Sequence, residues 1–263
     1  MLHYDKFHHP TSTDWVTFIH GAGGSSSIWH KQIRAFKAHL NVLLVDLRGH
    51  GNSKMKDLIF RPYTFEGIAK DVIEVFDYLN IEKSHLVGIS LGSIVSREIA
   101  EINPDRVSSL MLGGAVLQLN LKSKILMRFG VVFKNILPYM VLYKILAWVI
   151  LPRKNHKKAR LLFVNEARKL YQKEFIRWLK LMGELNNKLT AYQNSQIRIP
   201  TLYLMGSQDH LFLPAIEKIS KAQNNSKLVV FQNCGHVVNI EQPMQFNESC
   251  LQFISEVMML KSA

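Results

Sequence analysis

Short β-rich apolar runs alternate with helical segments along residues 1–117 and again along residues 200–263. This alternation is typical of βαβ units, since parallel neighbouring strands need a crossover connection that holds a helix. The chain has 263 residues, 48% of them hydrophobic, so it can bury a core without disulfides or metal. We therefore predict an α/β fold with a mostly parallel sheet, whose expected strands are residues 16–19, 42–46, 85–88, 109–113, 202–205 and 228–231.

Two stretches between the expected strands have helical periodicity. Residues 65–79 carry apolar side chains at spacings of three and four, which places them on one helix face. Residues 94–102 form a second expected helix, which ends before Pro104 because the residue preceding a proline disfavours the helical conformation. Both helices are expected to pack against the sheet.

The positive charge of the chain is concentrated in its middle. Residues 118–199 contain 17 Lys and Arg against 3 Asp and Glu, whereas residues 1–117 contain 12 of each and residues 200–263 contain 4 and 5. The formal net charge of +13 therefore comes from this central segment, which differs from its near-neutral flanks. We divide the chain into a core, residues 1–117 and 200–263, and an inserted segment, residues 118–199.

The inserted segment has no strand alternation. It is expected to form several amphipathic helices, interrupted at Pro138 and Pro152. Because it lies between two strands of one sheet, we expect it to fold as a helical cap, or lid, over one end of that sheet.

The apolar stretch 125–151 of the cap contains Arg128, Lys134 and Lys144. No uncharged run in it approaches the roughly 20 residues that a membrane span requires. Two interpretations remain open. The cap helices pack only on their own sheet, or they present a basic amphipathic surface that makes peripheral contact with anionic membrane lipid.

The segment Gly88-Ile89-Ser90-Leu91-Gly92 follows an expected strand and precedes an expected helix. A strand, a sharp turn with a serine and a helix together form a nucleophile elbow. Glycine is needed two residues on either side because a Cβ would clash in so tight a turn. The motif alone is weak evidence, since Gly and Ser are common, and its context gives it weight.

A serine hydroxyl becomes a strong nucleophile only when a base removes its proton and an acid orients that base. Asp209 lies in the loop after the expected strand 202–205, and His236 lies in the loop after the expected strand 228–231. Loops that follow parallel strands meet at the same edge of the sheet. We therefore predict Ser90, Asp209 and His236 as catalytic residues, in an order that one particular scaffold uses.

Four blocks in this order resemble the α/β-hydrolase superfamily, specifically its cap-containing branch with a serine nucleophile. They are HGAGG at residues 20–24, DLRGHGNS at residues 46–53, the Ser90 elbow, and the loops that carry Asp209 and His236. The resemblance runs from about Val16 to the end of the chain. It implies an eight-stranded, mostly parallel sheet with a helical cap inserted after the sixth strand. The opening hairpin departs from the family pattern, because residues 2–7 look like its second strand and little precedes them.

The resemblance also implies an oxyanion hole made by the backbone N–H groups of Ala22 and Leu91. In the family, the residue at the position of His20 supports the oxyanion loop, and the turn at residues 48–51 is structural. Two tryptophans of the cap, Trp148 and Trp178, are interpreted mainly as packing residues, with a role in lining a substrate pocket as the alternative.

A serine at the elbow excludes the haloalkane dehalogenases and epoxide hydrolases, whose elbow carries a carboxylate. We predict a serine esterase or lipase-like hydrolase that cleaves a carboxylic ester or thioester through an acyl-enzyme, on a small acyl substrate with an anionic or lipid-like part. A carbon–carbon bond hydrolase or lyase of the same fold is one alternative, in which Arg128, Arg168 or Arg177 binds a carboxylate. A hydrolase-like receptor for a small ligand is another.

Other sequence features bear on which cofactors and partners the protein binds and in which cell compartment it lies. The triad needs no organic cofactor, and Cys234 and Cys250 do not have the spacing of metal ligands, so we expect neither cofactor nor metal. The basic residues are mixed with apolar positions and no recognition motif accompanies them, so nucleic-acid binding is not expected. The N-terminus lacks the basic start and apolar run of a signal peptide, which favours a cytoplasmic location.

Overall fold

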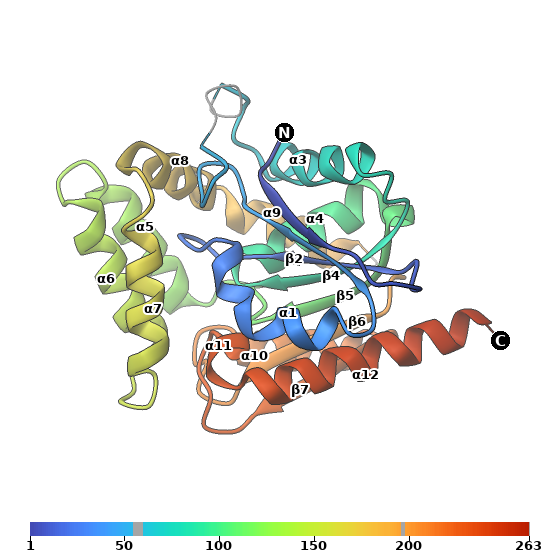
Figure 1. Ribbon diagram of the computed structural model, residues 1–263. Coiled ribbons are helices and arrows are strands. Elements are labelled where there is room, and N and C mark those ends of the chain that lie inside the picture. Colours follow the sequence, from blue (N-terminus) through green and yellow to red (C-terminus); the bar gives the residue numbers. More distant parts are fainter. Residues whose placement is uncertain (55–59, 196–197, 263) are drawn as a thin grey trace.

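The computed structural model describes residues 1–54, 60–195 and 198–262. Seven strands form one sheet in the order β1-β3-β2-β4-β5-β6-β7 (Figure 1). The strand β1 (Tyr4–Phe7) is antiparallel to β3 (Asn41–Val45), and all other pairs are parallel. The remaining strands are β2 (Trp15–Ile19), β4 (Ser84–Ile89), β5 (Val107–Gly113), β6 (Thr201–Gly206) and β7 (Ser226–Phe231). The predicted α/β fold is confirmed, and each expected strand lies within two residues of its predicted limits.

The sheet has seven strands in the described part of the chain, one fewer than the eight implied by the resemblance. Among the described residues β1 is the first strand, and it takes the place expected for the second strand of the opening hairpin. As a result β1 is the edge of the sheet, at the side opposite β7.

Helices cover both faces of the sheet. On one face α3 (Phe65–Tyr78), α4 (Leu91–Ile102) and α10 (Leu213–Ala222) share a buried cluster with alternate strand residues such as Ile19 and Leu86. On the other face α1 (His30–Phe36) and α12 (Pro243–Ser262) pack on the intervening residues, among them Phe18 and Val87 (Figure 1). Both faces are buried, which explains why the strands are apolar runs without polar alternation.

The two helices predicted from periodicity are α3 and α4. Thr64 caps α3, because its hydroxyl accepts a 2.9 Å hydrogen bond from the N–H of Gly67. The helix α4 ends at Ile102, as expected from Pro104, and a short 3-10 turn, η2 (Pro104–Arg106), follows it. A second 3-10 turn, η1 (Ser26–Trp29), precedes α1.

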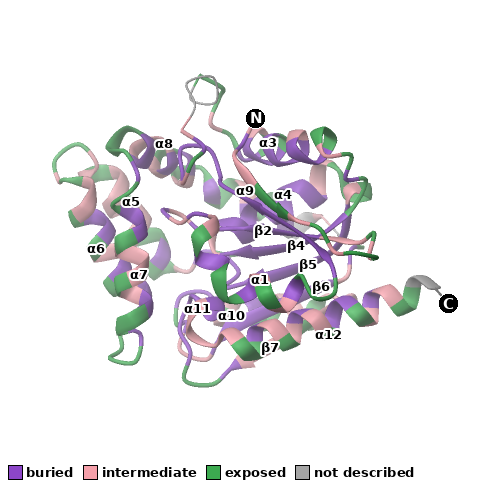
Figure 2. Cartoon of the chain, in the orientation of Figure 1, coloured by how far each residue is buried: buried purple, intermediate pink, exposed green. Residues whose placement is uncertain are grey.

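Five helices lie between β5 and β6: α5 (Leu121–Phe133), α6 (Tyr139–Ile150), α7 (Lys157–Ala167), α8 (Gln172–Gly183) and α9 (Leu185–Asn194). Pro138 and Pro152 lie between helices. The helices α5 to α8 stand beside one end of the sheet, whereas α9 returns along the core, where Leu189 and Tyr192 join the buried cluster (Figure 1). Figure 2 shows the contrast in exposure, with the central strands β3, β4, β5 and β6 buried throughout and the cap helices largely exposed or intermediate. None of the described helices is both long and apolar enough to cross a membrane.

Candidate active site

The loops after β2, β4, β6 and β7 meet at one end of the sheet, where the carboxyl ends of the strands lie. The register pairs Ile19 with Gly88, and Gly206 with Phe231, so these strands end close to a common line. In parallel sheets the carboxyl ends of the strands form the usual site for ligands and catalysis. The cap helices cover this end (Figure 1).

Ser90 occupies the tight turn between β4 and α4. Its backbone has φ 54° and ψ −114°, a conformation that side chains other than glycine rarely adopt. A Cβ on Gly88 would overlap the carbonyl oxygen of Gly92, and a Cβ on Gly92 would overlap the carbonyl oxygen of Ile19. The turn therefore requires glycine at both of these positions.

The side chains of Ser90, His236 and Asp209 lie in one line. The Ser90 hydroxyl is 2.8 Å from His236 Nε2, and His236 Nδ1 is 2.7 Å from an Asp209 carboxylate oxygen. The Asp209 carboxylate accepts a further hydrogen bond from the N–H of Phe212, and both Asp209 and His236 are buried. The sequence-predicted residues are thus brought within hydrogen-bond distance by three separate loops, the arrangement that activates a serine nucleophile.

Ala22 and Leu91 line the same cavity as Ser90 and His236. Leu91 is the first residue of α4, and an N–H at that position has no acceptor within the helix. Among the described residues, neither the Ala22 nor the Leu91 N–H donates to another protein group. Both donors are therefore available to an oxygen bound beside Ser90.

Two neutral histidines hold the backbone of the loop that contains Ala22. His50 Nε2 accepts from the N–H of Gly23 at 2.9 Å, and His20 Nε2 accepts from the N–H of Leu47 at 2.9 Å. Burial lowers the pKa of His20, and burial together with nearby His20 lowers the pKa of His50 to about 3. Each imidazole therefore stays neutral at pH 7 and keeps one nitrogen as an acceptor.

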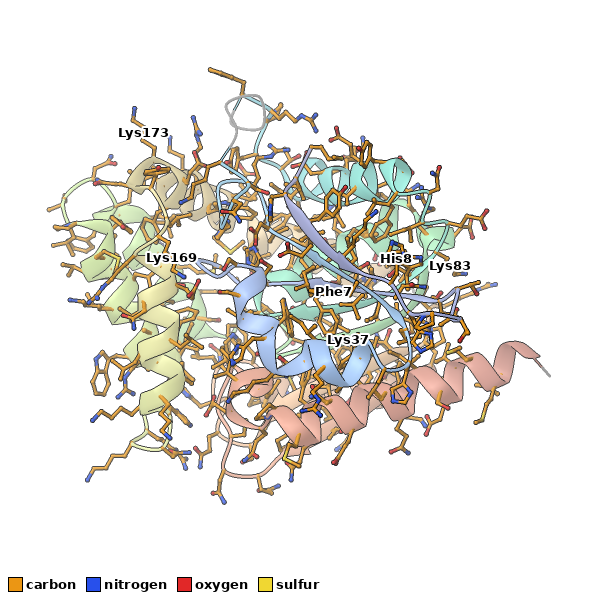
Figure 3. The ribbon with its side chains drawn as sticks, in the orientation of Figure 1. Phe7, His8, Lys37, Lys83, Lys169 and Lys173 are labelled. Atoms are coloured by element: carbon orange, nitrogen blue, oxygen red, sulfur yellow. The ribbon has the colours of Figure 1, made fainter. Side chains whose placement is uncertain are left out.

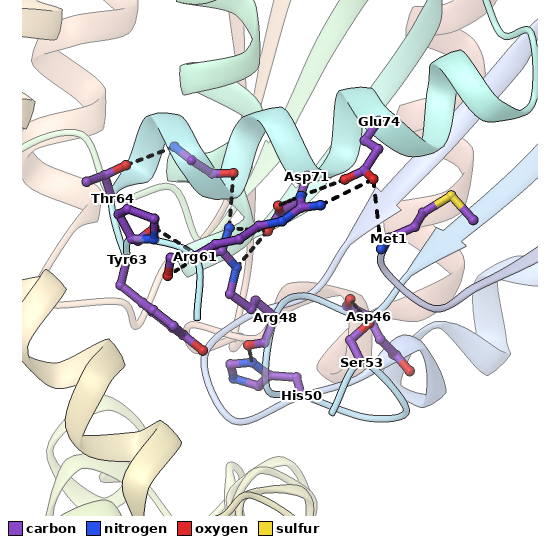
Figure 4. A network of polar contacts seen from close by, with 12 residues as sticks. Met1, Asp46, Arg48, His50, Ser53, Arg61, Tyr63, Thr64, Asp71 and Glu74 are labelled. Carbon is purple, nitrogen blue, oxygen red and sulfur yellow. Dashed lines mark hydrogen bonds and ion pairs between the residues drawn. The ribbon is translucent and has the colours of Figure 1, made fainter. Parts of the chain in front are cut away.

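The turn at residues 48–51 is anchored to α3 by a buried ion pair (Figure 4). The Arg48 guanidinium lies 2.6 Å from the Asp71 carboxylate of α3, and both side chains are buried. Arg61 contacts the same carboxylate and also pairs with Glu74. These contacts give the turn the structural role that the family resemblance implied.

Two cap residues that no sequence motif marks, Tyr143 and Glu166, contact the loop that contains Ala22. The hydroxyl of Tyr143 in α6 donates to the carbonyl oxygen of Ala22 at 2.5 Å. The carboxylate of Glu166 in α7 accepts from the hydroxyls of Ser25 and Ser27, each at 3.1 Å. No short motif marks these residues, because their helices reach the loop only through tertiary packing.

A second contact joins the cap to the loop that carries His236. His156, just before α7, is fully buried, and its Nε2 is 2.8 Å from the Gln208 side-chain oxygen. The same nitrogen is 3.7 Å from the carboxylate of Glu241, which accepts from the N–H of Gly235. Burial raises the pKa of Glu241. The loop of His236 is thus held between α11 (Val238–Glu241) and the cap.

An apolar cavity of about 150 Å³ extends from Ser90 into the cap. Aliphatic and aromatic side chains of α5, α6 and α8 form most of its wall, such as Met127, Leu146 and Leu179. Among the described residues, no Lys, Arg, Asp or Glu lines it. The cavity therefore suits an apolar group attached to the atom that meets Ser90.

The two tryptophans do not line this cavity, so the alternative role in a substrate pocket was wrong for both. Trp178 is buried and its indole N–H donates to the carbonyl oxygen of Arg48 at 3.0 Å, which docks α8 on the core. Trp148 is 57% exposed, on the outer side of α6, with the guanidinium of Arg160 3.6 Å from its ring centroid. Each helix is rotated about its axis so that neighbouring residues, and not these tryptophans, face the cavity.

A sequence profile described as the alpha/beta hydrolase family matches residues 18–249. The chain belongs to the alpha/beta hydrolase family. This assignment agrees with the seven-stranded sheet and with the position of Ser90 at the turn after β4. No group of three or more His, Cys, Asp or Glu side chains in the described ranges is arranged to hold a metal ion.

The proteins to which this chain is similar are named for different activities. The putative carbamate hydrolase RutD of Acinetobacter baylyi is 26% identical, over 96% of this chain and 98% of its own. A putative 2-succinyl-6-hydroxy-2,4-cyclohexadiene-1-carboxylate synthase of Bacillus subtilis is 24% identical, over 94% and 93%. The solved enol-lactonase of Burkholderia xenovorans has the same fold, with a TM-score of 0.78 at 21% identity over 97% and 96% of the two chains.

Proposed function

We propose that this alpha/beta hydrolase cleaves a carboxylic ester or thioester of an apolar acyl chain through a serine-linked acyl-enzyme. One observation carries the proposal: the apolar cavity of about 150 Å³ ends at the hydroxyl of Ser90, which lies 2.8 Å from a histidine base. A chain that fills the cavity positions its carbonyl carbon at the nucleophile.

The reaction follows from the positions of the side chains. The Ser90 oxygen attacks the acyl carbon while its proton passes to His236 Nε2. Asp209 remains ionised, accepts from His236 Nδ1–H and so fixes the tautomer whose Nε2 is free. His236 then gives the proton to the leaving alcohol or thiol, and a water that His236 deprotonates hydrolyses the ester of Ser90. The N–H groups of Ala22 and Leu91 stabilise the oxyanion, each by about 2.7 to 4 kcal/mol.

The cavity wall weakens the carbon–carbon hydrolase and lyase alternative. That alternative assigned a carboxylate to Arg128, Arg168 or Arg177. Arg128 and Arg168 are exposed, and Arg177 forms an ion pair with Glu174 at 2.5 Å. None of the three is among the residues that line the cavity. Among the described lining residues an anionic group on the substrate finds no basic partner, so we assign the apolar chain of the substrate to the cavity.

A series of p-nitrophenyl esters from acetate to palmitate tests the proposal. Each methylene that enters the cavity is expected to raise kcat/KM about fourfold, because burying a methylene contributes about 0.8 kcal/mol, until the cavity is full. Ser90→Ala and His236→Ala should abolish this turnover without unfolding the protein. Acetate as the fastest ester would contradict the acyl-chain assignment. Folded wild type without turnover on any ester would favour the lyase or receptor alternative.

A further inference from the structure

The outer sides of α5 and α6 carry exposed apolar side chains, and of these Trp148 is partly covered by the guanidinium of Arg160. On α5 the exposed residues Leu121, Ile125, Arg128 and Val132 follow each other at spacings of four, three and four, so they form one stripe. Leu121 is 73% and Ile125 60% exposed. The opposite side of the same helix lines the cavity. A helix that only covers the core needs a single apolar side, so the outer stripe calls for another contact.

The helix α6 repeats this pattern. Val141, Lys144 and Trp148 are exposed at spacings of three and four, whereas Leu142 and Leu146 line the cavity. Lys144 is the only charged residue of this helix. Since α5 and α6 contact each other, their stripes lie on adjacent helices. We call the exposed residues of these two stripes, with the exposed Lys122 and Lys124 of α5, the outer cap surface.

The charge of the outer cap surface is entirely positive. Lys122, Lys124, Arg128 and Lys144 form no ion pair with a described residue. The cap has three acidic residues, and two of them are buried against the core: Glu166 binds the oxyanion loop and Glu174 binds Tyr63. Glu184, the exposed one, lies beyond the end of α8. Figure 3 shows that basic side chains extend outward elsewhere on the cap as well, for example Lys173.

We propose that the outer cap surface docks the enzyme on an anionic lipid surface, with Leu121, Ile125 and Trp148 at the level of the headgroups. Cations beside aliphatic and indole groups match both parts of such a surface, the lipid phosphates and the acyl boundary. A second copy of this chain fits poorly, because a twofold contact would bring the same cations together. Nucleic acid would contact the cations and leave the aliphatic stripe unused.

The docking extends the proposed function, because it makes a lipid surface the source of the acyl substrate. In this respect alone it rests on the proposed function. The helices that carry the outer cap surface also form the wall of the cavity that ends at Ser90. An acyl lipid at the surface would therefore lie against the same helices that line the cavity. Binding to lipid itself does not require catalysis.

Flotation with vesicles tests the docking directly. The full chain is mixed with vesicles of phosphatidylcholine alone or of phosphatidylcholine with phosphatidylglycerol, at low and high salt. We expect binding to the anionic vesicles only, weakened by salt. Replacing four cations (K122Q, K124Q, R128Q and K144Q together) should lower the partition coefficient by about three orders of magnitude, since each basic residue near an anionic surface contributes about 1 kcal/mol. Trp148→Ala should lower it by roughly tenfold.

A matched variant removes the same charge from the core. Lys31, Lys37, Lys218 and Lys221 are exposed and replaced together by Gln. This control should bind anionic vesicles almost as well as wild type, and both quadruple variants should hydrolyse soluble p-nitrophenyl butyrate at the wild-type rate. Equal losses in the two variants would indicate a nonspecific charge effect and overturn the proposal. Absence of wild-type binding to anionic vesicles would also overturn it, as would binding to DNA in place of vesicles.

The outcomes separate docking from catalysis. Vesicle binding without hydrolysis of any ester would reject the proposed function and leave the docking intact. Hydrolysis of soluble esters without vesicle binding would reject the docking alone. Circular dichroism of each variant establishes that a lost activity is not a lost fold.

Discussion

The strand-end loops of the core and the helices of the cap meet at Ser90, yet they are built in opposite ways. In the core, Asp209, His236, His20 and His50 are buried and each has a specific hydrogen-bond partner. The cap has apolar residues both at its cavity and on its outer side, and nearly all of its exposed charges are positive. The buried hydrogen-bonded side chains and the apolar contact surfaces are thus concentrated in separate parts of this molecule.

The largest expected effect tests the fixed geometry of the core. Asp209→Asn should lower kcat by about 10⁴, because the neutral amide no longer holds the His236 tautomer whose Nε2 accepts the serine proton. Single-turnover and steady-state kinetics on p-nitrophenyl butyrate provide the measurement. The control is Glu217→Gln, an exposed carboxylate of α10, which should leave kcat unchanged. A loss of only a few fold in Asp209→Asn would show that the carboxylate does not orient the base.

The next effect tests the apolar contact of the cap. Leu146→Trp places a larger side chain in the cavity, and the kcat/KM for the longest accepted ester should fall by about 100-fold, equivalent to the burial of some three methylenes. Acetate hydrolysis should change little. Leu161→Trp on the exposed side of α7 is the matched substitution and should leave the chain-length profile intact. An unchanged profile in Leu146→Trp would mean that the chain binds elsewhere.

A pH experiment tests the buried histidines of the core. The pKa of His50 is lowered in the folded state, so the unfolded chain binds the proton more readily, and stability is present above pH 6.5 and falls as the pH drops toward 3. His50 should account for about 1.4 kcal/mol of unfolding free energy per pH unit in that window. Urea unfolding between pH 7 and pH 5 measures the slope. His50→Gln keeps an acceptor for Gly23 and should reduce the slope by this amount, while His20, whose pKa burial also lowers, keeps its own contribution. The exposed-residue variant His210→Gln should not reduce the slope.

The smallest expected effect lies at the junction of the two regions. Tyr143→Phe removes the hydroxyl that binds the carbonyl oxygen of Ala22, and a hydrogen bond of about 1 kcal/mol corresponds to roughly a fivefold loss of kcat. KM should stay near its wild-type value, since the apolar ring remains in place. Tyr139→Phe, another hydroxyl of α6, is the control. An equal rise in KM would assign Tyr143 to substrate binding and not to the oxyanion loop.

The sequence determined the parts of the protein that depend on local rules. Apolar runs and their spacing predicted the strands, and Pro104, Pro138 and Pro152 predicted where helices stop. Ser90, Asp209 and His236 were identifiable because each lies just after a strand, and the ends of parallel strands lie together. The concentration of positive charge in residues 118–199 was also visible from the sequence, since counting the charged residues is enough to show it.

The side that each cap helix turns toward Ser90 follows from tertiary packing and not from local sequence. Tyr143, Glu166 and His156 contact the loops that follow β2 and β6, whereas Trp148 faces outward and Trp178 docks on Arg48. The helices α5 and α6 are apolar on both sides, so the sequence gives them no unique inward face. Their orientation is fixed by the contacts that each helix makes with the core and with its neighbours, which no local pattern encodes.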